Sequence, residues 1–264
     1  MTQNEPIAAR LVVAETAARA AGAHALALFH DRKSLTIETK HDALDMVSRA
    51  DREAEEIVRA HLGEAFREDG FLGEEGGAQP GSSGLTWVID PIDGTVPFVS
   101  GLPHWCVAIA LQAGDRTEAG VIFQPTSGEM FTVRQGAGVW LNGARLAISA
   151  ETRLTNSLTA IGASHRTTPE HIATTIHRLM SEGGMFYRNG SGALMLAAVA
   201  AGRLGAYYEP HMNPWDCLAG LLMVREAGGR TLPLPEGEAL GAGGVVLAAA
   251  PGSWEAICAI TGQG

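Results

Sequence analysis

Residues 87–95 (Trp-Val-Ile-Asp-Pro-Ile-Asp-Gly-Thr) join a short apolar run to a cluster of carboxylates. Residues 87–89 have the character of a buried strand. Pro91 has no backbone N–H to donate to a sheet, so we expect the strand to end at Asp90. A tight turn would then bring the Asp90 and Asp93 carboxylates together, where they repel each other unless a cation or a shared proton neutralises them. The segment is therefore either a surface turn, because Asp, Pro and Gly are common turn residues, or a metal site.

The metal that suits this segment is a hard divalent cation. Its side chains offer carboxylate oxygens and neither a thiolate nor an imidazole, and Mg²⁺ prefers such ligands. Gly94 allows the backbone to approach a ligand, and Thr95 adds a hydroxyl group. Free N–H groups at this point are typical of a phosphate-binding turn. Acidic residues elsewhere in the chain must decide between the two interpretations.

Composition restricts the partners and the compartment. The formal net charge is −10 and no run of Lys or Arg follows one face, so we do not expect nucleic acid as the main partner. Cys106, Cys217 and Cys258 are scattered singly, which favours a reducing compartment. The amino terminus lacks the pattern of a signal peptide, and we see no uninterrupted apolar run long enough to cross a bilayer. These features predict a cytoplasmic protein with no membrane partner.

The first half of the chain reads as two helices followed by a sheet. Apolar residues at helical spacing predict an amphipathic helix over roughly the first thirty residues. Ser48 is a candidate N-cap for a second helix, and Asp51 lies in its first turn, where the helix dipole favours a carboxylate. Apolar runs at 106–111, 120–123, 130–133 and 139–141, with a turn at 142–143, predict an antiparallel sheet.

Two further acidic segments could complete a site. Glu74 and Glu75 follow a short apolar run and are flanked by glycines, so they form either a solvated turn or a third carboxylate position. Asp216 stands at the amino end of a helix that is apolar all round. It is either a cap of that helix or a metal ligand, and its position alone does not decide.

Helices alternate with strands after about residue 147, which predicts an α/β arrangement. We expect helices at 169–181, 192–202, 215–227 and 251–260, with strands at 205–209 and 245–249. The chain is accordingly divided into residues 1–147, an α+β unit with the antiparallel sheet and most metal ligands, and residues 148–264. The second unit would supply Asp216 and substrate contacts.

In this order and spacing, three segments resemble the signatures of the inositol monophosphatase family. They are Gly-Glu-Glu at 73–75, Asp-Pro-Ile-Asp-Gly-Thr at 90–95 and Trp-Asp-Cys-Leu-Ala-Gly at 215–220. The resemblance also includes the Lys40, Asp45, Val47, Ser48 and Asp51 pattern and residues 190–192, 207–209 and 225–229, so it covers nearly the whole chain. It implies a layered αβαβα sandwich of the inositol monophosphatase and fructose-1,6-bisphosphatase type. It further implies a lithium-sensitive, Mg²⁺-dependent phosphomonoesterase, usually a homodimer, that hydrolyses a small phosphorylated metabolite such as inositol 1-phosphate.

The resemblance also assigns roles to individual residues. Two to three Mg²⁺ ions would be held by Glu74, Asp90, the carbonyl of Ile92, Asp93 and Asp216. Thr95, supported by Asp51, would activate the attacking water, with Glu74 assisting a third ion through water. The N–H groups of Gly94 and Thr95 would hold the phosphate. The remaining substrate contacts would come from Asp93, Ser191, Gly192, Glu209 and Asp216.

The substrate is less constrained than the reaction. Pro97 stands near a position where typical members carry Asn, and Asn213-Pro214 precede Trp215 where inositol-acting relatives often carry His and Cys. Residues 100–105 look partly like histidinol-phosphate phosphatases of the same superfamily. The alternatives are therefore a histidinol-phosphate phosphatase or another small-metabolite phosphatase. A compact chain makes a bisphosphatase less favoured. From another class, a non-catalytic homologue that binds RNA-processing machinery remains an alternative.

Overall fold

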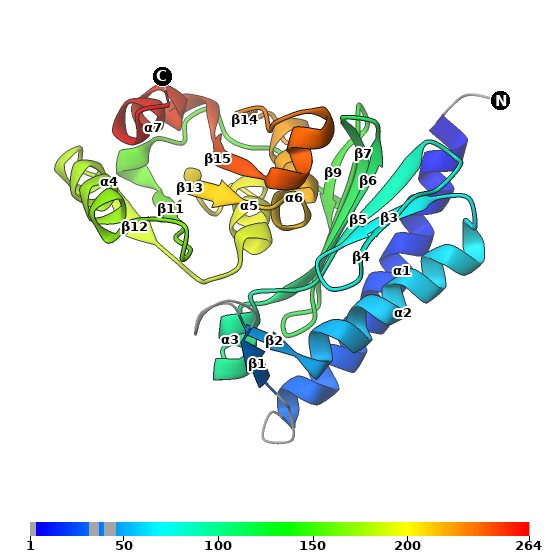
Figure 1. Cartoon of the computed structure of the whole chain (residues 1–264). Coiled ribbons are helices and arrows are strands. Elements are labelled where there is room, and N and C mark those ends of the chain that lie inside the picture. The colour runs from blue at the N-terminus through cyan, green and yellow to red at the C-terminus, as the bar shows by residue number, and fades with distance from the viewer. Residues whose placement is uncertain (1–3, 32–36, 40–45, 264) are drawn as a thin grey trace.

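Five layers make up the computed structural model, which describes residues 4–31, 37–39 and 46–263 (Figure 1). Helices α1 (Asn4–His30) and α2 (Arg49–Ala65) cover one face of a large sheet. Helices α5 (Gly192–Ala200) and α6 (Pro214–Glu226) lie between this sheet and a smaller one. Helices α4 (Pro169–Ser181) and α7 (Trp254–Thr261) form the outer layer on the far side. The predicted αβαβα sandwich is confirmed.

The large sheet is almost entirely antiparallel. Its order is β10-β9-β8-β7-β6-β5-β3-β4, and only β3 and β5 are parallel. The strands are β3 (Gly70–Gly73), β4 (Gly77–Gln79), β5 (Leu85–Asp93), β6 (Cys106–Ala113), β7 (Arg116–Gln124), β8 (Glu129–Arg134), β9 (Gly138–Leu141) and β10 (Ala144–Arg145). The predicted antiparallel runs correspond to β6 to β9. The predicted turn joins β9 to β10, with positive φ at both Asn142 (48°) and Gly143 (81°), as a tight hairpin requires.

The smaller sheet has the order β12-β11-β13-β15-β14. Its strands are β11 (Leu158–Ile161), β12 (Met185–Tyr187), β13 (Ala206–Met212), β14 (Arg230–Thr231) and β15 (Gly244–Ala249). Strand β11 pairs in parallel with β12 and β13, whereas β15 is antiparallel to both of its neighbours. All the helices and strands predicted after residue 147 are present. The last predicted helix is a 3-10 turn, η4 (Pro251–Ser253), followed by α7.

The remaining elements are short. Strands β1 (Ile37–Thr39) and β2 (Met46–Ser48) form an antiparallel pair, and α3 (Thr95–Ser100) follows β5 directly. Two further 3-10 turns lie in the described part of the chain, η2 (Leu154–Asn156) and η3 (Gly237–Ala242). Helix α2 begins at Arg49, immediately after the predicted N-cap residue Ser48. Lys40 and Asp45 of the family pattern lie outside the described residues, as does the side chain of Ser48.

The central helices are apolar all round because sheets cover them on both sides. One core cluster contains residues from both sheets together with nearly all of α5 and α6. Gly120 of β7 makes this close packing possible, since a Cβ there would lie 2.9 Å from the Ala219 Cβ on α6. The two halves therefore share a core, and the boundary at residues 147 and 148 remains a prediction.

Helix α1 is the longest helix of the described residues and is rich in alanine. Residues Ile7–His30 are long and apolar enough to span a membrane by length and composition, with a mean hydropathy of 1.2. The apolarity comes mainly from alanine. Ala14, Ala18 and Ala21 are fully or almost fully buried, on a helix that packs against α2 and the large sheet. Because this face forms part of the core, we interpret α1 as a core helix.

Candidate metal centre and active site

The prediction that strand β5 ends at Asp90 is wrong. The strand continues through Pro91 to Asp93. Asp90 pairs with Ala108 of β6 and Asp93 pairs with Cys106, so three steps on β5 match two on β6. This register shift is a β-bulge, where a missing N–H is tolerated. In a regular strand, residues three apart point to opposite faces of the sheet, and the extra residue of a bulge brings them to the same face. The bulge therefore places Asp90 and Asp93 on the same face of the sheet, the one that carries α5 and α6.

Two other elements bring Glu74 and Asp216 to Asp90. Strand β3 runs parallel to β5, and the Glu74 N–H donates to the Ile89 carbonyl at 3.1 Å, so Glu74 lies beside the bulge. Asp216 comes from the first turn of α6 in the other half of the chain. Carboxylate oxygens of Glu74, Asp90 and Asp216 all lie within 4.8 Å of one another.

The electrostatics of this group favour a bound cation. Burial raises the pKa of Asp90 well above its usual range, and the charges of Glu74 and Asp93 raise it further. Burial and the neighbouring Glu74 likewise raise the pKa of Asp216. Three converging carboxylates, two of them with raised pKa values, need a compensating positive charge, and an all-oxygen donor set suits Mg²⁺. These residues therefore fit the metal that the sequence predicts.

Asp216 combines the two roles that the sequence left open. Its Oδ2 accepts hydrogen bonds from the Asn213 backbone N–H at 3.1 Å and from the Asn213 side-chain amide at 3.3 Å, so it closes the amino end of α6. It also belongs to the three-carboxylate group. The helix cap therefore fixes the carboxylate in its position beside Glu74 and Asp90.

Thr95 lies one residue beyond the turn at Gly94. Its hydroxyl donates to the Asp51 carboxylate at 3.4 Å and lies 3.3 Å from the Ile92 carbonyl. Asp51 is 1% exposed, in the first turn of α2. Gly94 has φ 99°, and a Cβ there would lie 2.6 Å from the His104 carbonyl oxygen, so only glycine fits this turn. The Thr95 hydroxyl and the Asp51 carboxylate, which the sequence predicts to act together, thus face each other next to the three-carboxylate group.

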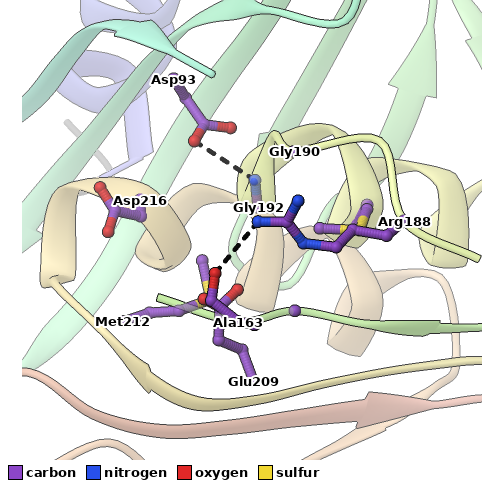
Figure 2. Close-up of a pocket in the computed structure, with 10 residues that line it drawn as sticks. Asp93, Ala163, Arg188, Gly190, Gly192, Glu209, Met212 and Asp216 are labelled. Carbon is purple, nitrogen blue, oxygen red and sulfur yellow. Dashed lines mark hydrogen bonds between the residues drawn. The ribbon is translucent and has the colours of Figure 1, made fainter. Parts of the chain in front are cut away.

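The Asp93 carboxylate is directed to the amino end of α5. Its oxygens accept hydrogen bonds from the Ser191 hydroxyl and from the Ala193 N–H at 2.7 Å. A third hydrogen bond comes from the Gly192 N–H at 3.2 Å (Figure 2). Burial raises the pKa of Asp93, and these hydrogen bonds oppose the increase. Ser191 is fully buried and also caps α5 through the Leu194 N–H. Asp93 therefore joins the large sheet to α5, and its predicted metal contact remains a proposal.

Two adjoining cavities open beside these residues and share Ala163, Arg188 and Gly190. The larger, of about 600 Å³, includes Glu74, Gly94 and Thr95 in its wall. The smaller, of about 110 Å³, is lined by Asp93, Gly192, Glu209 and Asp216 (Figure 2). Together they form a crevice with the carboxylate group and the Thr95 turn at one end and Glu209 at the other.

Glu209 forms the far wall of the smaller cavity. Its carboxylate accepts a hydrogen bond from the buried hydroxyl of Tyr207, and a Cβ at Gly162 would overlap it. Burial raises its pKa to about 7, although the Tyr207 hydrogen bond and the charge of Arg188 act in the opposite direction. Figure 2 shows Arg188 and Glu209 lining the same pocket, with the Arg188 guanidinium donating to the Ala163 carbonyl at 3.1 Å.

Comparison with known proteins decides the family. The sequence profile described as the inositol monophosphatase family matches residues 8–263. The chain belongs to the inositol monophosphatase family. It is 38% identical over 204 residues to an inositol-1-monophosphatase of Rhizobium meliloti, covering 76% of each chain. It is 36% identical over 245 residues to a protein of Pasteurella multocida named Nus factor SuhB, covering 91% of each.

The fold agrees with this assignment. A crystal structure of extragenic suppressor protein suhB from Bartonella henselae superimposes with a TM-score of 0.87 at 34% identity, covering 96% of this chain and 97% of that one. Membership of the inositol monophosphatase family supports a phosphatase. The three sequence segments that carry the resemblance meet in one crevice of this chain.

Sequence reasoning missed two residues at this inositol monophosphatase-like site. Arg188 contributes a positive charge to both cavities, and its place just before residues 190–192 was the available signal. Glu55 contacts the turn that carries Glu74. Its spacing of four residues from Arg59 predicts only a helix-surface ion pair, so the sequence offered no reason to place it near a ligand.

The raised pKa of Glu209 predicts a pH-dependent stability difference. From the ordinary value of 4.5 to about 7, the unfolded chain has lost this proton while the folded protein keeps it, so the free energy of unfolding falls as pH rises through this window. Glu209→Gln removes this effect. With metal removed by EDTA, we expect the variant to be more stable than wild type at pH 8 by about 1–3 kcal/mol, with the difference disappearing by about pH 4.5.

Chemical denaturation at several pH values measures this difference. Glu151 is exposed, and Glu151→Gln makes the matched control for removal of a surface carboxylate. A Glu209→Gln minus wild-type difference that does not change with pH would contradict the raised pKa.

Proposed function

We propose that the protein is a Mg²⁺-dependent phosphomonoesterase that hydrolyses a small polyol phosphate such as inositol 1-phosphate with metal-activated water. The observation that carries this proposal is the meeting of Glu74, Asp90 and Asp216 within 4.8 Å, beside the Thr95 and Asp51 pair. Converging carboxylates with raised pKa values beside a hydroxyl that donates to another carboxylate are typical of a catalytic site.

The metal ligands would be Glu74, Asp90, Asp216, the carbonyl of Ile92 and Asp93, for two to three Mg²⁺ ions. When bound, Mg²⁺ neutralises phosphate charge and lowers the pKa of a coordinated water. The chain's own residues would do the rest. The Gly94 and Thr95 N–H groups would hold the phosphate oxygens. The Thr95 hydroxyl would accept a proton from the attacking water as it passes its own to Asp51, which is 3.4 Å away.

The leaving alcohol would lie in the smaller cavity. Asp93, Gly192 and Glu209 would contact its hydroxyl groups, with Ser191 holding the Asp93 carboxylate in place. A wall of carboxylates suits a polyol or an amino alcohol, which donates hydrogen bonds. Inhibition by lithium, a homodimeric assembly and a cytoplasmic location belong to the same proposal.

The substrate alternative is histidinol phosphate or another small phosphorylated metabolite. Pro97 is one reason to consider a substrate other than inositol phosphate. It packs so tightly on Gly190 that a Cβ on Gly190 would lie 2.7 Å from the Pro97 Cγ. This contact joins the phosphate turn to the segment that carries Arg188 and Gly192. Relatives named Nus factor SuhB support a regulatory alternative. We favour hydrolysis because all five predicted side chains (Glu74, Asp90, Asp93, Thr95 and Asp216) are present.

A phosphate-release screen with 5–10 substrates tests the function. Inositol phosphates, histidinol phosphate, glycerol phosphates, sugar phosphates and adenosine bisphosphate are incubated with Mg²⁺ or with EDTA. We expect release from a polyol phosphate that depends on Mg²⁺ and disappears with EDTA. Release from histidinol phosphate alone would select the alternative substrate, and no release from any ester would contradict the phosphatase assignment.

A further inference from the structure

We infer that Glu55 is a positioning residue for the metal centre: its buried carboxylate holds the turn that carries Glu74. Glu55 lies on α2 and is 2% exposed. Its Oε2 accepts a hydrogen bond from the Glu75 N–H at 2.8 Å, and its Oε1 accepts one from the Gly76 N–H at 3.0 Å. Both donors belong to the tight connection between β3 and β4, immediately after Glu74.

Arg59 completes this attachment from the next turn of α2. Its Nε donates to Glu55 Oε1 at 2.6 Å, and its Nη2 donates to the Gly77 carbonyl at 2.7 Å. The guanidinium also lies over the Phe71 ring, 5.3 Å from the centroid. The ion pair satisfies the Glu55 charge away from water, and the two side chains together bind both sides of the turn.

The glycines around Glu74 allow Glu55 to come this close. A Cβ at Gly73 would overlap Glu55 Oε1, and a Cβ at Gly76 would lie 2.7 Å from the same atom. The glycine-flanked pair of acids is therefore a half-exposed turn whose backbone closes around a buried carboxylate from another element. Without that carboxylate, two turn N–H groups lose their acceptor.

One face of α2 thus supports both parts of the site. Asp51 and Glu55 are four residues apart, which places them on the same side of the helix. Asp51 accepts from Thr95, and Glu55 fixes the backbone of Glu74. Replacement of a residue that orients a metal ligand typically changes metal affinity or activity by about 10–100-fold.

This inference rests on the proposed function, since it takes Glu74 as a Mg²⁺ ligand. The test compares wild type with Glu55→Ala and Glu55→Gln by titration calorimetry with MgCl₂. We expect Mg²⁺ affinity to fall by ~10–100-fold in Glu55→Ala and less in Glu55→Gln, which keeps one acceptor. The Mg²⁺ concentration for half-maximal hydrolysis should rise by the same factor, and saturating Mg²⁺ should restore kcat. Glu56→Gln is the matched control, because Glu56 is the exposed neighbour on α2.

Hydrogen exchange in metal-free protein provides a second readout. The Glu75 and Gly76 amides should exchange faster in both Glu55 variants, while β6 amides keep their protection. If a folded Glu55→Ala protein binds Mg²⁺ within twofold of the wild-type affinity, the inference about Glu55 is overturned and the proposed function is not. If that variant does not fold, the same limit applied to Glu55→Gln decides. A wild-type protein that binds no Mg²⁺ would instead overturn the proposed function, and this inference with it.

Discussion

Asp90→Asn is expected to abolish Mg²⁺-dependent hydrolysis while making the metal-free protein more stable. Asp90 is 2% exposed, and burial together with four neighbouring carboxylates raises its pKa. Asparagine keeps the Oδ1 atom that accepts the Ile92 N–H at 3.0 Å, so the bulge retains its hydrogen bond. The substitution removes the charge that repels Glu74 and Asp216, and the free energy of unfolding should rise by about 1–3 kcal/mol in EDTA at pH 8.

The same variant should lose its response to metal. Wild type should gain about 2.7 kcal/mol at a Mg²⁺ concentration of 100 times Kd, whereas Asp90→Asn should gain little. Denaturation with and without Mg²⁺, together with phosphate-release kinetics, measures both effects. Asp115→Asn is a control for the loss of one exposed carboxylate outside the crevice, and asparagine keeps the Oδ1 atom that accepts the Gly237 N–H at 2.6 Å. An Asp90→Asn protein with wild-type turnover would exclude the proposed centre.

Thr95→Ala is expected to lower kcat by ~10²–10⁴-fold without weakening Mg²⁺ binding to the same extent. The Thr95 hydroxyl bonds to Asp51, and the side chain lies in the wall of the larger cavity. Loss of the hydroxyl removes the group that would transfer the proton, whereas the three metal carboxylates stay in place. Thr95→Ser keeps the hydroxyl and should retain most of the activity.

Asp51→Asn tests whether the two residues act as one unit. Groups that act together give strongly non-additive effects, so the Thr95→Ala, Asp51→Asn double variant should be about as impaired as Thr95→Ala alone. Steady-state kinetics at saturating Mg²⁺ measure kcat for each variant. A Thr95→Ala enzyme with wild-type kcat would contradict the proposal that Thr95 and Asp51 together take a proton from the attacking water. Fully additive effects in the double variant would contradict it as well.

The site residues were identifiable because three short segments carry their chemistry locally. Glycine, proline and adjacent acids in 73–75 and 90–95 show turn geometry and oxygen ligands regardless of the rest of the chain. The wrong prediction for the end of β5 arose because only neighbouring residues in the sequence were considered. Pro91 reads as a strand end when β6 is not considered, but pairing with β6 turns it into a bulge. That bulge, and not a terminating turn, aligns Asp90 with Asp93.

Local sequence patterns could not predict how the acidic side chains of different helices and strands are arranged around the site. Whether Asp216 caps α6 or faces Asp90 depends on how α6 packs across β5 and β6, and the answer is both. Asp93 was predicted as a metal ligand and substrate contact, whereas in the fold its carboxylate accepts hydrogen bonds from one hydroxyl and two N–H groups at the start of α5. Glu55 and Arg188 carry no motif, since their roles arise only from what folds against them.

The amino-acid sequence by itself indicated the family, most of the longer helices and strands, and the set of acidic residues available to bind a cation, because these depend on motifs, periodicity and residue chemistry within short segments. Tertiary packing alone decided which carboxylates converge, which are used to anchor a helix, and how α2 supports the Glu74 turn. The reason is physical: hydrogen bonding and charge repulsion act over a few ångströms, and only folding brings residues 55, 74, 90 and 216 within that range.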